Sequence, residues 1–158
     1  MATQLYETDF YGWTQEQAAK LRALLAERSN LDLDVENIAE ELEDMGRSNR
    51  SQLVNRLAEL DEHLMKLAFS PKGEPRRQWE NSVKGQRYSL AKLLRKNPSL
   101  RPHLDEALAE AHQDALRIFN DKLLVELLMN EPPELCPFDL TDMLSDEWWP
   151  EPKTTDYA

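Results

Sequence analysis

Apolar residues recur every three or four positions along most of this chain, which is the spacing that places them on one face of an α-helix. The most regular stripe consists of leucines alone, at Leu53, Leu57, Leu60, Leu64 and Leu67. No run of alternating apolar and polar residues is bounded by turn residues, and only four glycines occur, so nothing in the pattern favours a strand. The chain is therefore predicted to be an all-α single-domain bundle of about five or six helices.

Capping residues and helix breakers divide this pattern into segments. Thr14, with a glutamine three residues later, has the pattern of a capping box and predicts a first helix over about 15–28. Asp32 or Asp34 can cap a second helix. This second helix continues through the leucine stripe either as one long rod or as a tight helix pair, depending on whether Gly46 ends it.

Two prolines and a glycine within residues 70–75 cannot continue a helix, so a loop is expected there. A basic helix over 75–96 follows, and it ends at Asn97 because a proline comes next. Ser99 can cap a further helix that runs to about residue 128.

The C-terminal part is richer in proline and aromatic residues. Asp139 can cap a short helix. The adjacent Trp148 and Trp149 are expected to fold back on the protein as part of an extended, aromatic-rich segment. Together these segments predict one helical domain over 1–152 and a flexible tail over 153–158.

Charge is distributed unevenly along the 158 residues, whose formal net charge is −11. Residues 72–101 form a basic island, and the segments on either side are acidic. Net negative charge repels a phosphate backbone at long range and disfavours nonspecific nucleic-acid binding. No apolar run approaches the roughly 18 residues of a membrane span, and the N-terminus lacks the pattern of a signal peptide. A cytoplasmic protein without a membrane partner is expected.

The single cysteine, Cys136, cannot form an internal disulfide, and no spacing of cysteine and histidine matches a zinc motif. Cys136 also lacks a cationic neighbour in the sequence that would favour its thiolate. The sequence therefore predicts a small buried apolar residue at this position, and it predicts no cofactor.

Several unusual blocks occur in the same order as in a known protein family. They are residues 6–13, 40–48, 63–66, 97–100, 136–138 and 149–151, together with Trp79 and Arg87. In these blocks the chain resembles the bacterial DUF29 family of small α-helical proteins of unknown function, so the resemblance implies a fold and no reaction. His112 departs from the family pattern, which usually has an aromatic residue there, and residues 120–135 match poorly.

The densest acidic patch contains Glu40 and Glu43, which share one helix face at a spacing of three residues. With His63, which flanks the leucine stripe, these carboxylates form a candidate site for a divalent metal or for proton transfer. The alternative is structural, because acids early in a helix stabilise its dipole and can pair with the basic helix. The Glu-x-x-His pattern of di-iron bundles is absent.

The basic helix is a candidate for binding RNA or single-stranded DNA. Arg76, Arg77 and Arg87 supply charge, and Trp79 between them offers an aromatic ring for stacking on a base. The charges are spread around the helix, however, so pairing with the many acids of the chain or of a partner is the competing use.

By elimination, the sequence favours a non-catalytic interaction or accessory module that binds another protein or a second copy of itself. Trp148 and Trp149 offer a docking patch for such a partner, although a terminal aromatic pair also closes a core. The alternatives are a metal-dependent enzyme that uses the Glu/His cluster and a nucleic-acid-binding regulator that uses the basic helix.

Overall fold

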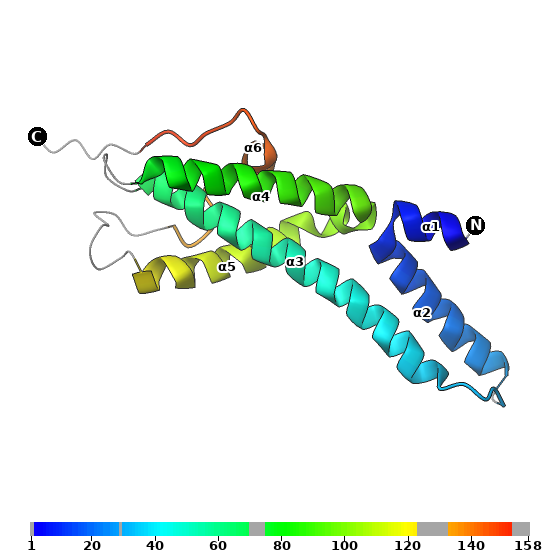
Figure 1. Cartoon of the computed structure of the whole chain (residues 1–158). Helices are drawn as coiled ribbons and strands as arrows, with labels where there is room; N and C mark the ends of the chain where they lie inside the picture. The colour runs from blue at the N-terminus through cyan, green and yellow to red at the C-terminus, as the bar shows by residue number, and fades with distance from the viewer. Residues whose placement is uncertain (1, 29, 70–74, 123–132, 153–158) are drawn as a thin grey trace, which may run out of the picture. The chain divides into compact units, whose positions relative to one another are not determined.

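The computed structural model describes residues 2–28, 30–69, 75–122 and 133–152. Within these ranges every regular element is helical and no strand occurs, which confirms the predicted all-α fold. The elements are α1 (Ala2–Thr8), α2 (Phe10–Glu27), α3 (Val35–Phe69), α4 (Arg76–Lys96), the 3-10 helix η1 (Pro98–His103), α5 (Leu104–Lys122) and α6 (Leu140–Leu144) (Figure 1). No helix of the described residues is both long and apolar enough to cross a membrane. The tail predicted over 153–158 lies outside them.

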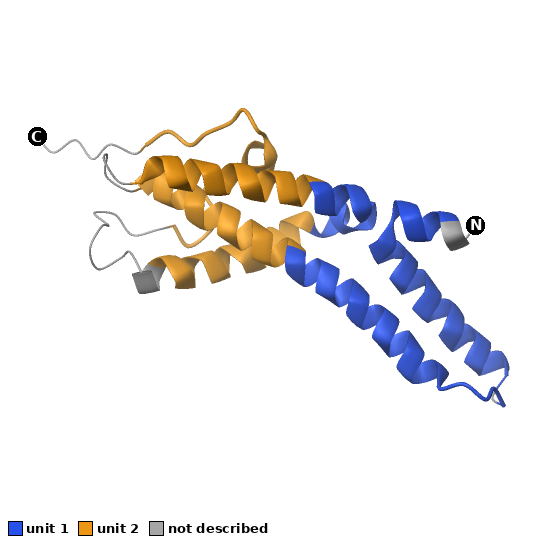
Figure 2. Ribbon diagram, viewed as in Figure 1, with its two compact units in different colours: residues 1–52, 92–103 blue, residues 53–91, 104–158 orange. Residues whose placement is uncertain are grey.

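The chain divides into two compact units, which Figure 2 shows in blue and orange. Unit 1 contains residues 1–52 and 92–103, and unit 2 contains residues 53–91 and 104–158. Since α3 and α4 each contribute one part to each unit, neither unit is a continuous piece of chain. A single domain over 1–152 stays a prediction.

Unit 1 is organised around the start of α2. Asp9 caps this helix by accepting a hydrogen bond from the backbone of Gly12 at 3.2 Å, and its carboxylate also accepts from the Ser99 hydroxyl at 2.9 Å. The side-chain oxygen of Asn97 accepts from the backbone nitrogen of Tyr11 at 2.9 Å. These bonds hold η1 and the end of α4 against the start of α2.

The predicted start of this first helix is wrong. α2 begins at Phe10 rather than near residue 15, and Thr14 lies buried inside it, where its hydroxyl donates to the carbonyl of Tyr11 at 2.7 Å. Ser99 does not cap an α-helix either, because its hydroxyl binds Asp9 and residues 98–103 form a 3-10 helix before α5 begins. The Ser99 hydroxyl thus bonds to Asp9, which is distant in the sequence, instead of capping a helix that begins next to it.

α3 is one long helix, which confirms the rod that the leucine stripe allowed. Asp34 precedes it, and its carboxylate accepts from the backbone of Asn37 at 3.4 Å. Gly46 lies inside the helix and does not end it. A β-carbon at position 46 would lie 2.6 Å from the Thr14 hydroxyl oxygen, so α2 and α3 cross closely in unit 1.

The core of unit 2 is formed by the leucine stripe of α3 together with side chains of α4, α5 and α6. Every leucine of the stripe is buried. The buried apolar residues from the other helices are Trp79, Val83, Leu90, Ala107, Ala111, Ala115, Phe119 and Met143. As predicted, Asp139 caps α6 by accepting from the backbone of Thr141 at 2.8 Å. The predicted end of α5 at about residue 128 falls outside the described residues.

Candidate metal centre

The three metal ligands expected from the sequence all lie on α3. Glu43 is occupied by Arg22, whose guanidinium binds both of its carboxylate oxygens, one of them at 3.2 Å. This hydrogen bonding holds the pKa of Glu43 below its usual value. Glu40 is exposed. Within the acidic patch, Glu43 is thus engaged by an arginine of α2, and Asp44 pairs with Arg47 of α3 itself.

His63 does not meet these carboxylates. Its Nδ1 lies 2.7 Å from the carbonyl oxygen of Glu59, one turn earlier in the same helix. Twenty positions of α3 separate Glu43 from His63, which corresponds to about 30 Å of helical rise. The three side chains are therefore not brought together into one ligand set.

The residues expected to bind other macromolecules are partly used inside unit 2. Arg76 donates to the carbonyl of Leu67 at 3.0 Å, and Arg87 and Trp79 are buried, whereas Arg77 is exposed. At the C-terminal end, the ring of Trp148 packs edge-on against Phe138, with 5.6 Å between the ring centres. The ring of Trp149 lies over the Arg87 guanidinium at 5.0 Å.

A different set of side chains meets inside unit 2. Asp61 comes from α3, His112 from α5, and Cys136 from the segment that precedes α6. One ligand atom from each lies within 4.8 Å of the other two. Asp61 is 0% exposed and His112 is 1% exposed, so two groups of the cluster that can carry charge are removed from water.

Helix periodicity explains why these residues face each other. Asp61 follows Leu57 by four positions and precedes Leu64 by three, so it lies on the buried side of α3. His112 lies between the buried Ala111 and Ala115 on α5. Small alanines leave room on α5 for an imidazole ring to reach the carboxylate.

His112 is held by two hydrogen bonds. Its Nδ1 lies 2.5 Å from a carboxylate oxygen of Asp61, and its Nε2 lies 2.9 Å from the backbone carbonyl of Pro133. A carbonyl oxygen only accepts, so Nε2 carries the proton that it donates to Pro133. Burial alone would lower the pKa of His112, but the bonds to Asp61 and Pro133 outweigh burial and raise it.

Cys136 contacts the carboxylate rather than the imidazole ring. Its Sγ lies 3.6 Å from Oδ1 of Asp61 and 3.7 Å from the sulfur of Met143. Burial, together with the negative charge of Asp61, raises the pKa of Cys136 to about 12. The side chain is then a neutral thiol at pH 7, so this arrangement does not make the activated thiolate of a Cys–His nucleophile.

The cluster opens on one side into a cavity of about 360 Å³. His112 and Cys136 form part of its wall, and the highly exposed Leu135 lies at its rim. The remaining lining residues are Asp105, Leu108, Ala109 and Gln113. The cavity therefore borders the half-buried Cys136 and the ring of His112, whereas Asp61 does not line it.

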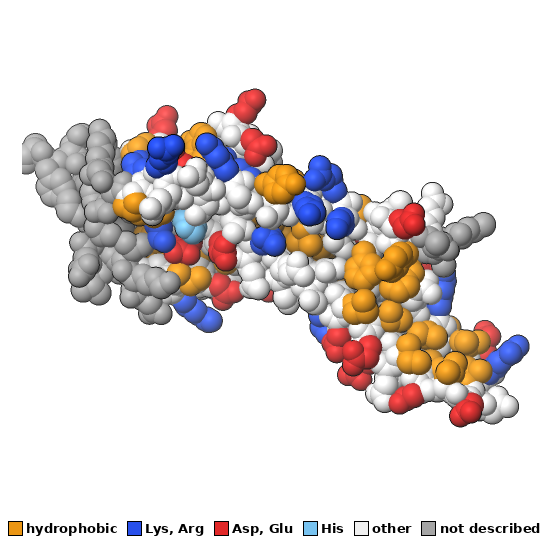
Figure 3. Space-filling model, viewed as in Figure 1, with side chains coloured by type: hydrophobic (Ala, Val, Ile, Leu, Met, Phe, Trp, Pro, Cys, Tyr) orange, Lys and Arg blue, Asp and Glu red, His pale blue; other side chains and the backbone are white. Residues whose placement is uncertain are grey.

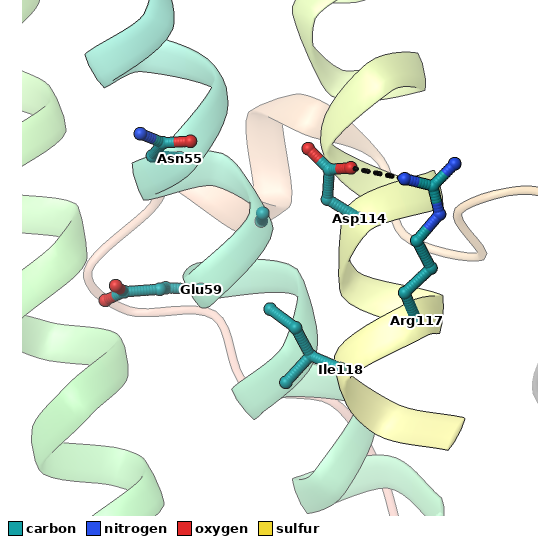
Figure 4. A pocket seen from close by; sticks show the side chains of 6 residues that line it. Asn55, Glu59, Asp114, Arg117 and Ile118 are labelled. Atoms are coloured by element: carbon teal, nitrogen blue, oxygen red, sulfur yellow. Dashed lines mark ion pairs between the residues drawn. The ribbon is translucent and has the colours of Figure 1, made fainter. Parts of the chain in front are cut away.

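A second hollow of unit 2 lacks this convergence of polar groups. It measures about 430 Å³ and lies between α3 and α5. Figure 4 shows that Asn55 and Glu59 point away from Asp114 and Arg117, which pair with each other at 3.8 Å. The side chain of Ile118 projects from α5 toward α3. This hollow therefore offers no constellation for catalysis.

The sequence contained only part of the signal for the Asp61 cluster. A charged residue among the leucines of a helix stripe marks Asp61 as unusual, and His112 already stood out against its family pattern. The sequence does not predict a place for Cys136 in this cluster, because its partners are 75 and 24 positions away and no short motif links them.

Comparison with known proteins supports the fold. A search of curated proteins found no match. Among solved structures, the chain is similar to an α-helical protein of unknown function from Rhodospirillum rubrum ATCC 11170, with 26% sequence identity and a TM-score of 0.71 over 90% of each chain. Residues 5–149 match the family described as "Domain of unknown function DUF29". Since this match spans most of the sequence, the chain belongs to the DUF29 family.

Proposed function

We propose that this protein is a metalloprotein in which Asp61, His112 and Cys136 hold one divalent transition-metal ion of the zinc class. The observation that carries the proposal is the meeting of a carboxylate, an imidazole and a thiol, with their ligand atoms within 4.8 Å of one another inside unit 2. The three come from separate elements of the chain, so folding alone brings them together.

The ligand chemistry selects the class of ion. Thiolate and imidazole are ligands for zinc, cobalt and copper, whereas magnesium and calcium prefer sets made of oxygen atoms. Cys136 is a neutral thiol without the ion, and a bound divalent ion would displace its proton. The thiolate formed in this way and the Asp61 carboxylate together would carry two negative charges, which the ion balances.

The distances require one modest adjustment. Bond lengths of about 2.0–2.3 Å to zinc place the ligand atoms of a tetrahedral site roughly 3.3–3.6 Å apart. The two contacts of Asp61 use different oxygens: Oδ1 lies 3.6 Å from Sγ of Cys136, which already matches this separation, and Oδ2 lies 2.5 Å from Nδ1 of His112. The ion would replace the hydrogen of the Oδ2–Nδ1 bond, which widens that separation by about 1 Å.

The surroundings support His112 as a ligand through Nδ1. A histidine that binds a metal commonly donates its other ring N–H to a backbone carbonyl, which fixes the orientation of the ring. Here the Nε2 bond to Pro133 has that role.

Three protein ligands leave one position of a tetrahedral ion open. His112 and Cys136 line the adjacent cavity, so this position would be accessible to water or to a small substrate. Zinc sites with three protein ligands and an open position are typical of catalysis, because the ion lowers the pKa of its bound water and polarises carbonyl groups. We therefore propose Lewis-acid or hydrolytic chemistry as the use of the ion.

Cobalt(II) substitution tests the proposal directly. Because Cys136 is the single cysteine, a sulfur-to-cobalt charge-transfer band in the near ultraviolet reports on this side chain alone. We expect the band to saturate at one equivalent of cobalt. It should be lost in Cys136→Ser, and metal affinity should fall by about 100-fold or more in His112→Ala and Asp61→Asn, since even changes outside the ligand set cost 10–100-fold.

The matched controls are His63→Ala and Glu40→Gln, which alter the ligands expected from the sequence. Both should keep the band and the affinity, and circular dichroism should show that all variants retain their helices. Cobalt binding without a thiolate band, or no saturable binding below about 10 µM, which corresponds to roughly −7 kcal/mol of binding free energy, would refute the assignment.

A further inference from the structure

The inner side of the α2–α3 helix pair in unit 1 is made of small residues. Thr14 and Ala18 on α2 and Val35 and Ala39 on α3 are almost completely buried. Together with the close crossing at Gly46, they let the two helices approach each other. A contact of this kind buries little apolar surface, because the side chains in it are small.

The larger apolar side chains of this helix pair lie outside that contact. Leu33, Ile38 and Met45 are 62%, 42% and 46% exposed. Ile38 and Met45 lie seven positions apart, with the half-buried Leu42 between them, which places all three on one face of α3. On α2, Leu24 is also exposed. Figure 3 shows hydrophobic side chains gathered in patches over this part of the molecule, with acidic side chains beside them.

The two ends of unit 1 carry opposite charge. At the end formed by the α2–α3 connection and the first turns of α3, residues 31–45 contain seven acids and no base, and two of these acids, Glu36 and Glu43, pair with Arg22 of α2. At the other end, residues 92–103 contain four bases and no acid; with the neighbouring Glu7 and Asp9 this end keeps a net charge of +2 (four bases less two acids). The bonds from Asp9 to Ser99 and from Tyr11 to Asn97 fix this basic end at the start of α2, about 27 Å of helix away from the acidic end.

We propose that a second copy of this chain docks on the apolar face of the α2–α3 pair in an antiparallel, two-fold arrangement. In this arrangement the acidic end of each copy lies opposite the basic end of the other, and two helix pairs close one four-helix core. A two-fold contact requires a surface that complements itself, and unit 1 provides both the apolar stripe and the two opposite charges. Four helices around one apolar core are a common stable solution for such amphipathic pairs.

Sedimentation velocity on the full chain tests this inference. At about 100 µM protein and low salt, we expect a species of twice the chain mass of 18.4 kDa. The double variant Ile38→Glu with Met45→Glu, which places charges on the apolar face, should be a monomer with an unchanged helical circular dichroism spectrum. Tyr88→Glu is the control, because Tyr88 is a large exposed side chain, 67% exposed, that lies on α4 in unit 2, and this variant should remain dimeric.

The orientation has its own test. Reversing charge at the basic end, as Arg95→Glu with Lys96→Glu, should weaken the dimer by about tenfold or more at low salt, since opposite charges across an interface steer and hold the two partners. High salt should weaken the wild-type dimer in the same direction. A wild-type monomer at 100 µM, or a dimer that survives the stripe variant, would overturn the docking surface. A dimer unaffected by the charge reversal would overturn the antiparallel arrangement.

Discussion

Arg87 joins the end of the chain to the middle of α4. Its Nε donates to the carbonyl of Met143 at 2.7 Å, and its Nη2 donates to the carbonyl of Trp148 at 2.8 Å. The helix pattern predicts part of this arrangement. Arg87 follows the buried Val83 by four positions and precedes the buried Leu90 by three, so it lies on the buried side of α4. Counting basic residues instead placed it among surface charges, and its backbone acceptors could not be read from the sequence.

Replacing Arg87 with Met should loosen the C-terminal segment of unit 2. Two carbonyl groups lose their donor, and leaving buried polar groups unsatisfied costs about 1–3 kcal/mol each. We expect the free energy of unfolding to fall by roughly 2–4 kcal/mol, with a red shift of tryptophan fluorescence as Trp148 and Trp149 become wetter. Arg77→Met is the control, since Arg77 is exposed on the same helix, and equal effects of the two variants would contradict the anchoring role.

Asp61, His112 and Cys136 show where residue-level reasoning from sequence ends. A carboxylate within a leucine stripe is visible in the pattern, but its partners depend on which turn of α5 faces α3 and on where the segment before α6 returns. Helix crossing and register decide both, and neither follows from periodicity. The expected cluster of Glu40, Glu43 and His63 fails for a related reason, because one unbroken helix keeps these residues apart.

A metal ion should stabilise the folded chain in a manner that depends on these side chains. At a free zinc concentration of 100 times the dissociation constant, binding to the folded state alone adds about 2.7 kcal/mol. We expect thermal unfolding of the wild type to shift upward with zinc and that of Cys136→Ser to remain in place. An equal zinc-dependent shift in both proteins would show that zinc binds elsewhere.

The helices are the most predictable feature of the fold, because the apolar stripe that indicates each helix can be read from that helix's own residues. The start of α4 within one residue and the cap of α6 by Asp139 follow from local patterns. The single rod of α3 is one of the two alternatives that the pattern left open at Gly46. The start of α2 does not, since Asp9 is held by Ser99 from a distant segment. A capping box at Thr14 is equally good locally, and only the tertiary contact decides between the two starts.

Substitutions at two glycines within helices, Gly46 and Gly85, distinguish the effect of close packing on stability from the effect of helix propensity. A β-carbon at position 46 would lie 2.6 Å from the Thr14 hydroxyl oxygen and from the Gln15 side-chain nitrogen. Gly46→Ala should therefore cost about 1–3 kcal/mol, the range for overpacking a close contact. At Gly85 nothing lies within 4 Å of such an atom, and Gly85→Ala should add about 0.5–1 kcal/mol through helix propensity. Urea titrations measure both, and stabilisation by both substitutions would contradict a close α2–α3 crossing.

At the scale of the whole molecule, the charge of the protein bears on whether it binds nucleic acid. The chain carries a net charge of −11, and the basic helix is partly used within the described structure, since Arg87 and Trp79 are buried. Trp79 is therefore unavailable for stacking on a base, which leaves Tyr88 as the exposed aromatic ring of that helix. The basic island is visible in the sequence, but which of its side chains make internal contacts depends on the tertiary structure.

Binding to single-stranded nucleic acid should accordingly be weak. Fluorescence anisotropy with a labelled 20-nucleotide DNA in about 150 mM salt should give a dissociation constant no tighter than roughly 10⁻⁴ M, the weak end of nonspecific binding. Submicromolar affinity that falls steeply with salt and is lost in Arg77→Gln with Lys84→Gln would contradict this expectation and restore the basic helix as a nucleic-acid interface.

X-ray absorption at the zinc edge tests the central claim most directly, because it counts the sulfur atoms bound to the ion. For protein loaded with one equivalent of zinc, the Asp61–His112–Cys136 site predicts one sulfur at about 2.3 Å and the other ligands as nitrogen or oxygen near 2.0–2.2 Å. A shell of nitrogen and oxygen alone would place the ion on exposed acids or histidines and contradict the site. Two sulfurs per zinc would show an ion shared between chains, which contradicts it equally.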